Sequence, residues 1–386
     1  MSINYKRLGD IATYINGYAF KHKDWGTKGL PIIRIQNLTG SSKEINFYDG
    51  DIDEKYIVRK GDILIAWSAS LGVHEWNGEK ALLNQHIFKV VFDKEKINKN
   101  FFKFMVQKVL ERTQKYLHGS TMKHITKKYF DNLLIPFPPL EIQEKIAGTL
   151  LLAESLVNKR KAQIEALDQL TQSVFLEMFG DPLGNPKGWQ KITFKDYISK
   201  VNKINLKNSK NNIKYIDISS IDNNKNKITS YTEYIGIEAP SRAQQVVQKG
   251  DILISTVRPN LKNIAMVMDN YDNLICSTGF CVIRCTEKLN NDFIFHLIKT
   301  DSFTKNLVKK TTGANYPAVK NSDIYNESII YPPIDLQEKF SNITKQIEEK
   351  KRFLENSLSY QEKLFNSILQ KAFNGELFTE EKASNF

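Results

Sequence analysis

Two stretches of the chain carry apolar residues at helical spacing. In the first, apolar positions fall mostly three or four residues apart from Ile146 to Met178, and in the second from Phe340 to Ala372. Each stretch follows a Pro-Pro pair and ends at a glycine-containing turn. About forty helical residues at 1.5 Å each form a rod of roughly 60 Å. The pattern therefore predicts two long amphipathic helices, over 138–181 and 332–378.

The remaining regions, 1–137 and 182–331, show a different pattern. Short or alternating apolar runs such as DILIAW and FCVIR lie between Gly, Asn and Asp turns, which is typical of strands. An amphipathic shorter helix is expected in each region, over 100–117 and 291–310. These features predict an α+β fold class with two α/β domains of mainly antiparallel sheet. Residues 379–386 are expected to form a tail.

The two halves of the chain repeat one another. The segment PPLEIQEKI at 138–146 returns as PPIDLQEKF at 332–340, and KGDILIAWS at 60–68 returns as KGDILISTV at 249–257. Between these anchors the two copies differ, so a constant framework carries divergent loops. We expect an internal pseudo-two-fold repeat in which the long helices pair as an antiparallel coiled coil. Two separate bundle helices are the alternative.

The charge balance narrows the class of partner. Lys and Arg number 55 against 43 Asp and Glu, giving a formal net charge of +12, which favours nucleic acid first and a membrane surface second. No run approaches the roughly 20 apolar residues that span a bilayer, and no signal peptide is visible at the start. We therefore expect no membrane association and a cytoplasmic protein.

Catalytic and metal-binding signatures are missing from the sequence. The three cysteines, Cys276, Cys281 and Cys285, match no common zinc spacing, so buried reduced thiols are expected. The spacing of glycines fits no phosphate loop, and neither Pro-Pro pair is followed by the aromatic residue of amino-group methyltransferases. The sequence thus predicts no catalytic residue, no metal site and no cofactor in this chain.

The duplicated segments resemble a known family. GSTMKHITKKYFDNLLIPFPPLEIQEKIA at 119–147, with a looser second copy at 312–340, resembles the recurring features of the specificity subunits of type I restriction–modification systems. The resemblance covers nearly the whole chain. It implies two target-recognition domains, at 1–137 and 182–331, alternating with a central helix at 138–181 and a C-terminal helix at 332–378.

The resemblance also implies a function. Such a subunit is a non-catalytic, sequence-specific DNA-binding protein that reads a bipartite target in double-stranded DNA. It recruits two methyltransferase subunits, which use S-adenosylmethionine, and motor-nuclease subunits for restriction. The alternative is a coiled-coil protein-interaction scaffold without DNA readout, which salt-dependent DNA binding would exclude.

Base-reading residues are sought among polar side chains on loops and strand ends, because Arg, Asn, Gln and Ser can match the hydrogen-bonding pattern of the major groove. The candidates in the first domain are Arg34, Gln36, Asn37, Ser68, Ser70, Asn84, Gln85 and His86. The candidates in the second domain are Ser219, Ser220, Arg258, Asn260, Lys262, Thr278, Asn315 and Tyr316. Arg258 is preferred because arginine contacts guanine through two hydrogen bonds.

Lys123 and Lys320 are expected to anchor DNA phosphates. His124, beside Lys123, is a further DNA-binding candidate and lacks the paired nucleophile or carboxylate that a catalytic base needs. In the second copy Pro317 and Ala318 replace this Lys-His pair, so its role is not carried over there.

Overall fold

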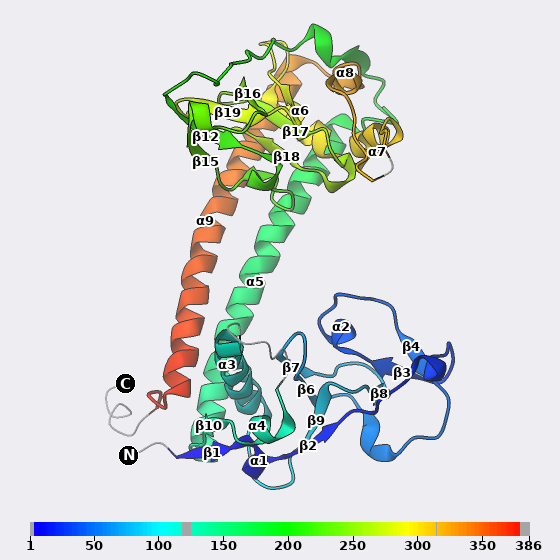
Figure 1. Cartoon of the computed structure of the whole chain (residues 1–386), viewed down its shortest axis with the longest axis vertical. Coiled ribbons are helices and arrows are strands. Elements are labelled where there is room, and N and C mark those ends of the chain that lie inside the picture. The colour runs from blue at the N-terminus through cyan, green and yellow to red at the C-terminus, as the bar shows by residue number, and fades with distance from the viewer. Residues whose placement is uncertain (1–3, 118–124, 314, 379–386) are drawn as a thin grey trace. The chain divides into compact units, whose positions relative to one another are not determined.

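The computed structural model describes residues 4–117, 125–313 and 315–378. The chain divides into two compact units, Met1–Lys161 with Asn356–Phe386, and Ala162–Glu355. The two long helices expected from the sequence are present as α5 (Leu140–Phe179) and α9 (Ile334–Phe373), and each contributes a part to both units (Figure 1). The two units are therefore described one after the other.

The first unit contains two four-stranded sheets. One has the order β2-β9-β6-β7 and is antiparallel throughout, whereas the other has the order β4-β3-β8-β5 and contains one parallel pair, β3 with β8. The strands are β1 (Tyr5–Arg7), β2 (Thr13–Asn16), β3 (Leu30–Ile33), β4 (Asn46–Tyr48), β5 (Ile57–Val58), β6 (Ile63–Ala66), β7 (Gly72–Glu75), β8 (Ala81–Leu83), β9 (Ile87–Val91) and β10 (Leu134–Pro136), the last pairing with β1. The helices are α1 (Leu8–Ile11), η1 (His22–Asp24), α2 (Ile35–Leu38), η2 (Glu54–Tyr56), α3 (Lys99–Leu117) and α4 (Lys127–Asp131).

The second unit repeats this plan. Its four-stranded sheet has the order β15-β12-β19-β16, again with one parallel pair, β12 with β19, and its three-stranded sheet has the order β18-β17-β20. The strands are β11 (Gln190–Thr193), β12 (Asn212–Ile216), β13 (Ile221–Asp222), β14 (Lys227–Ile228), β15 (Thr232–Ile235), β16 (Ala243–Val246), β17 (Ile252–Ser255), β18 (Ile264–Met266), β19 (Leu274–Ser277), β20 (Phe280–Ile283) and β21 (Ser328–Tyr331). The helices are η3 (Phe194–Asp196), η4 (Ile218–Ser220), η5 (Gly236–Glu238), η6 (Pro259–Leu261), α6 (Asn291–Lys299), α7 (Asp301–Lys309) and α8 (Asn321–Tyr325).

The internal repeat is thus present in the fold as well as in the sequence. The sheet β4-β3-β8-β5 corresponds strand for strand to β15-β12-β19-β16, and β6 with β9 corresponds to β17 with β20. The second unit has no strand equivalent to β2 among its described residues, but Ile198 forms a single antiparallel bridge with Cys285 there. The expectation of two mainly antiparallel α/β domains is confirmed.

The long helices pair in antiparallel fashion within each unit. In the first unit Ile146 and Leu150, near the start of α5, share a core with Leu369 and Ala372, near the end of α9. In the second unit the ring of Phe175, near the end of α5, lies 5.5 Å from that of Phe340, near the start of α9. Buried positions recur at alternating spacings of three and four, the seam of a coiled coil. In the part of α9 that belongs to the second unit, this spacing is followed by Gln337, Phe340, Thr344, Ile347, Lys351 and Leu354.

A buried glutamine ties each long helix to a shorter one. The side-chain amide of Gln143 donates a hydrogen bond to the carbonyl of Pro138 at 2.8 Å, and its oxygen accepts one from the backbone N–H of Asn98 at 3.0 Å. Gln337 makes the same two bonds, at the same lengths, one repeat later. Asn98 directly precedes α3, so the Gln of the repeated Gln-Glu-Lys motif holds the start of the shorter helix against the long one. We call this pair of hydrogen bonds the glutamine lock.

One expected element differs from the structure. The sequence predicts a single helix over 291–310, but the chain forms two, α6 and α7, separated at Thr300. The hydroxyl of Thr300 accepts a hydrogen bond from the backbone N–H of Phe303 at 3.3 Å and so caps α7. A side chain that satisfies a free helix-end donor stabilises a new helix start, which the apolar spacing does not reveal.

The cysteines are free thiols in the interior of the second unit. Cys276 and Cys281 are buried and Cys285 is partly buried, and none forms a disulfide. Burial raises the pKa of Cys281 and of Cys285 to about 12, so these thiols stay protonated and unreactive. Among the described residues no cluster of His, Cys, Asp or Glu could hold a metal ion. No helix in that part of the chain is long and apolar enough to cross a membrane.

Candidate nucleic-acid interface

In the first unit the candidate residues gather where the two parallel strands end. β3 and β8 run side by side with Ile33 opposite Leu83, so Arg34 and Asn84 follow at the same sheet edge. The backbone N–H of Asn84 donates to the carbonyl of Ile33 at 3.2 Å. The short helix α2, which contains Gln36, follows the first of these strands, and Gln85 and His86 follow the second. Two segments chosen from the sequence are therefore neighbours in space.

This sheet edge carries unused hydrogen-bonding groups. Three buried polar atoms on these strands and their ends have no partner among the described residues: Nε of Arg34, Nδ2 of Asn46 and Oδ1 of Asn84. Asn46 lies on β4 opposite Ile32 of β3, which places it beside the other two. Leaving such groups unpaired costs about 1–3 kcal/mol each, so native proteins usually keep them for water or a ligand.

A third candidate segment joins these two. Ser68 and Ser70 follow β6, which pairs with β9. The backbone N–H of Trp67 donates to the carbonyl of His86 at 3.2 Å, and the rings of these two residues lie 4.9 Å apart. A cavity of about 420 Å³ opens beside them, lined by Asn16, Trp67, Phe88, Ile125, Thr126 and Lys127. Lys123 and His124 lie outside the described residues.

Asn37 has a different place from the other candidates. Its side-chain oxygen accepts a hydrogen bond from the backbone N–H of Arg34 at 3.0 Å, and its amide donates to the carbonyl of Glu44 at 2.8 Å. Both ends of this side chain are therefore used to shape the loop around α2. The guanidinium of Arg34 lies 5.2 Å from the ring of Trp25, a contact that orients it.

The second unit places its candidates at the equivalent edge. β12 and β19 are parallel, with Ile216 opposite Cys276, so Ser219 and Thr278 follow the two strand ends. Both side chains are exposed. Ser220, in contrast, is 5% exposed, and its hydroxyl accepts a hydrogen bond from the backbone N–H of Asp217 at 3.2 Å. Its position is that of a structural residue in the turn η4.

The segment after β17 meets residues 316–318. The backbone N–H of Arg258 donates to the carbonyl of Pro317 at 2.7 Å, and its guanidinium lies 4.9 Å from the ring of Tyr316. The backbone of Thr256 bonds to Gly279, next to Thr278, at 2.9 Å. Arg258, Tyr316 and Thr278 are thus brought together from three parts of the sequence. Asn260, Asn315 and Lys320 are exposed nearby in the same loops.

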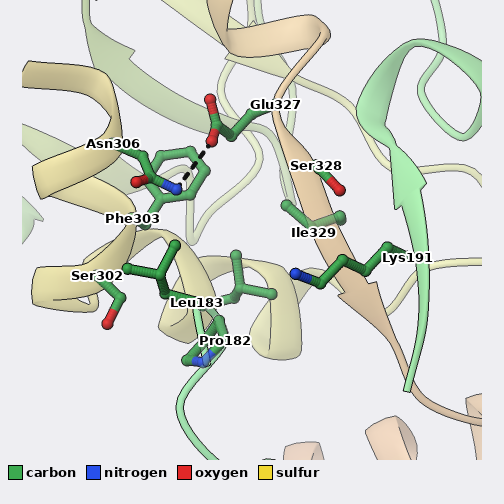
Figure 2. Close-up of a pocket in the computed structure, with 10 residues that line it drawn as sticks. Pro182, Leu183, Lys191, Ser302, Phe303, Asn306, Glu327, Ser328 and Ile329 are labelled. Atoms are coloured by element: carbon green, nitrogen blue, oxygen red, sulfur yellow. Dashed lines mark hydrogen bonds between the residues drawn. The ribbon is translucent and has the colours of Figure 1, made fainter. Parts of the chain in front are cut away.

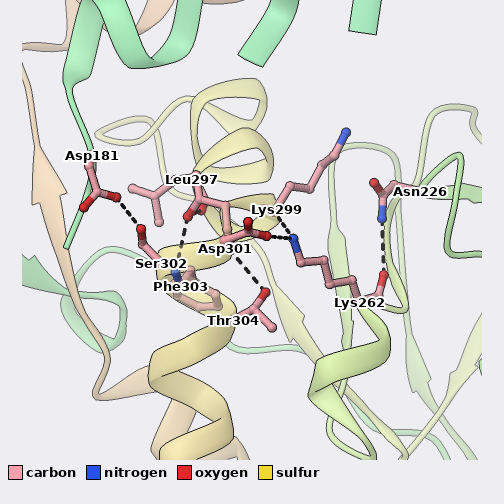
Figure 3. A network of polar contacts seen from close by, with 10 residues as sticks. Asp181, Asn226, Lys262, Leu297, Lys299, Asp301, Ser302, Phe303 and Thr304 are labelled. Atoms are coloured by element: carbon pink, nitrogen blue, oxygen red, sulfur yellow. Dashed lines mark hydrogen bonds and ion pairs between the residues drawn. The ribbon is translucent and has the colours of Figure 1, made fainter. Parts of the chain in front are cut away.

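Lys262 serves a structural contact. Its ammonium group pairs with Asp301 at 2.5 Å and donates to the carbonyl of Lys299 at 3.1 Å, as Figure 3 shows. The side chain of Asn226 reaches the carbonyl of Lys262 at 3.2 Å. Lys262 therefore fastens the loop after β17 to the start of α7, with its charge already matched.

A smaller cavity of about 100 Å³ lies elsewhere in the second unit (Figure 2). The buried carboxylate of Glu327 in its wall is bound by Lys310 at 2.5 Å and by the amide of Asn306 at 3.2 Å. Lys191 lines the same cavity. The charge of the Glu327 carboxylate is therefore already matched within the chain by Lys310.

Sequence reasoning missed Asn46, Trp25 and Trp67, which lie beside the candidate residues at the ends of β3, β8 and β6 in the first unit. Their positions follow from strand pairing and ring packing between distant segments, for which no local pattern exists. The signal that could have found Trp67 is the KGDILI anchor, since Trp67 lies directly after that strand in the first copy and Thr256 in the second.

The fold and the two loop clusters define a two-domain protein with a cluster of polar loops at the equivalent sheet edge of each domain. The family model for the type I restriction modification DNA specificity domain matches residues 2–166 and 186–360, so the chain belongs to this family. It is a specificity subunit with two DNA-recognition domains, and specificity subunits of type I systems are not catalytic. The alternative of a scaffold without DNA readout is not favoured.

Individual relatives match this chain over nearly its whole length and over most of their own. The EcoBI type I restriction enzyme specificity subunit of Escherichia coli is 23% identical and covers 98% of this chain and 87% of its own. The MjaVIII specificity subunit of Methanocaldococcus jannaschii is 25% identical, with 94% and 91% covered. The type I restriction–modification S subunit of M. genitalium has the same fold, with a TM-score of 0.56 over 96% of each chain at 15% identity.

Proposed function

We propose that this subunit reads a bipartite target in double-stranded DNA, one half-site through each recognition domain. The loops at the carboxyl ends of the parallel strand pair would make the contacts. The observation that carries this proposal is a constant sheet with divergent polar loops, since Arg34 and Gln85 in the first unit stand where Asp217 and Thr278 stand in the second. One scaffold with two loop sets supplies two different readings.

The proposed contact residues are those whose polar groups are exposed or unpaired at these edges. They are Arg34, Gln36, Ser68, Ser70, Asn84, Gln85 and His86 in the first domain, and Ser219, Arg258, Asn260, Thr278, Asn315, Tyr316 and Lys320 in the second. Asn37, Ser220 and Lys262 are assigned instead to the support of the loops, because their polar groups are used within the chain.

The partners follow from the family and from the repeat. The relatives are named as subunits of type I restriction enzymes, and we extend this to two methyltransferase subunits, which would supply S-adenosylmethionine chemistry, and to motor-nuclease subunits. The pseudo-two-fold repeat supports two equivalent binding sites for the methyltransferase. Large apolar side chains exposed on the long helices support a protein partner there: Leu152 is 65% exposed, Phe353 64% and Tyr360 74%.

The test is co-expression of the chain with its methyltransferase partner, followed by mapping of methylated adenines across a genome by single-molecule sequencing. The chain alone and the methyltransferase alone are the controls. A bipartite motif that requires both proteins supports the proposal. A stable complex that marks no motif contradicts the DNA-reading role of the loops. DNA binding by the complex should also weaken steeply with added salt, because phosphate contacts release counterions.

A further inference from the structure

The two recognition domains share a strained backbone position that carries very different side chains. Three residues after the equivalent strands β6 and β17, Ala69 has φ +58° and Arg258 has φ +49°. Both strands begin after a glycine at positive φ, Gly61 at +87° and Gly250 at +90°. A left-handed conformation at a non-glycine residue costs on the order of 1 kcal/mol, so the surrounding fold must impose it.

The fold imposes this turn through the same contact in both domains. The carbonyl of Trp67, two residues before Ala69, accepts a hydrogen bond from the backbone N–H of Ile125 at 3.2 Å. The carbonyl of Thr256, two residues before Arg258, accepts one from the equivalent N–H, that of Val319, at 2.9 Å. The side chain at the turn is therefore presented by a constant scaffold and can change without altering it.

In the second domain this side chain is an arginine with an available head group that lies near an aromatic ring. Arg258 is exposed, and no hydrogen bond or ion pair to its guanidinium is present within the described part of the chain. The ring of Tyr316, which is 70% exposed, lies 4.9 Å from the guanidinium carbon. Arg284 is the contrasting case, since both of its bonding nitrogens are occupied by Asp251. Stacking on an aromatic ring orients the planar donor fork before a ligand arrives.

We propose that Arg258 is a specificity-determining residue that reads one guanine of the second half-site through its O6 and N7 atoms. This inference rests on the proposed DNA-reading function. It adds the identity of the base, a guanine, and the left-handed backbone turn that presents Arg258 to it. Arginine is the side chain best matched to the two guanine acceptors in the major groove. Ala69 offers only a methyl group at the equivalent position, so the first domain makes no such contact and reads its half-site through other residues.

The experiment uses the subunit co-expressed with its methyltransferase, with motifs mapped by single-molecule sequencing. Replacing residues 1–137 by those of a related subunit first identifies the half-site that belongs to the second domain. Arg258→Ala should then make one guanine position of that half-site degenerate, with a loss of discrimination of about 10- to 100-fold. The other half-site should not change.

Four further variants separate loss of the guanine contact from a folding effect. Arg258→Asn keeps a residue that tolerates the left-handed conformation, and it should lose the guanine preference as Arg258→Ala does. Tyr316→Ala should weaken discrimination at the same base, whereas Tyr316→Phe should retain it because the ring is kept. Lys210→Ala is the control for loss of a positive charge. Lys210 is exposed and lies before the start of β12, whereas Ser219 and the proposed contact loops follow the end of that strand. This substitution should leave the motif unchanged.

The outcomes separate this inference from the function on which it rests. If the parent complex marks no bipartite motif, the proposed function fails. If the motif is present but the second half-site contains no guanine on either strand, the assignment of Arg258 is wrong while the function stands. A uniform loss of methylation at all sites in Arg258→Ala, with the motif intact, would make Arg258 a phosphate contact and overturn the guanine assignment.

Discussion

The glutamine lock gives the sharpest prediction about stability. Gln143→Ala removes a side chain that is 1% exposed and leaves two partly buried backbone groups, the N–H of Asn98 and the carbonyl of Pro138, without their partner. Each unpaired group costs about 1–3 kcal/mol, so we expect a loss of about 2–4 kcal/mol from the first unit. For a unit of this size that corresponds to a fall in melting temperature of roughly 4–16 °C.

Differential scanning calorimetry of the full chain measures this effect. Glu144→Ala is the matched control, because Glu144 is the next residue on α5 and is exposed, and it should change stability by no more than about 0.5 kcal/mol. Gln337→Ala should destabilise the second unit by a similar amount, since its two bonds have the same lengths. A Gln143→Ala melting temperature within about 1 °C of the parent would refute the lock.

Three further predictions concern the second unit. Asp251→Asn should cost about 3 kcal/mol in chemical denaturation, because it breaks the buried pair that Asp251 forms with Arg284 at 2.6 Å. Burial lowers the pKa of His296 to about 3, so the free energy of unfolding should fall as pH drops from about 6.5 towards 3, and His296→Phe should flatten that slope in urea titrations at several pH values. Cys281 and Cys285 should react with a thiol reagent far more slowly in the folded protein than in urea; rapid labelling without denaturant would contradict their burial.

The sequence is informative where one residue spacing has one structural meaning. The apolar spacing predicts α5 and α9 to within a few residues, because a coiled-coil seam needs a buried residue every three or four positions. The repeat likewise predicts two related domains. In contrast, the parallel pairing of β3 with β8 joins segments about fifty residues apart in the sequence, and a strand pattern does not say which neighbour a strand chooses.

The sequence also does not show the hydrogen-bond partners of polar side chains, because these partners come from distant segments. Ser219 and Ser220 are adjacent and chemically identical, yet one is exposed and the other is buried in a turn. Lys262 is a residue type that commonly binds DNA phosphates, but its positive charge is paired with Asp301, which lies 39 residues away in the sequence. Sequence reasoning therefore selects polar segments near the strand ends, whereas coordinates are needed to separate the exposed residues from those that hold the loop.

This separation has a physical consequence for how mutations should act. The guanidinium of Arg258 makes no hydrogen bond within the described part of the chain, so its loss removes little folding energy, whereas Gln143 spends its hydrogen bonds entirely on the fold. Variants of the first kind should change the methylated motif at an unchanged melting temperature. Variants of the second kind should lower the melting temperature and leave the motif intact. A scaffold that keeps its stability in the Gln-Glu-Lys locks and, as proposed, its readout at the ends of β12, β17 and β19 can acquire a new specificity without refolding.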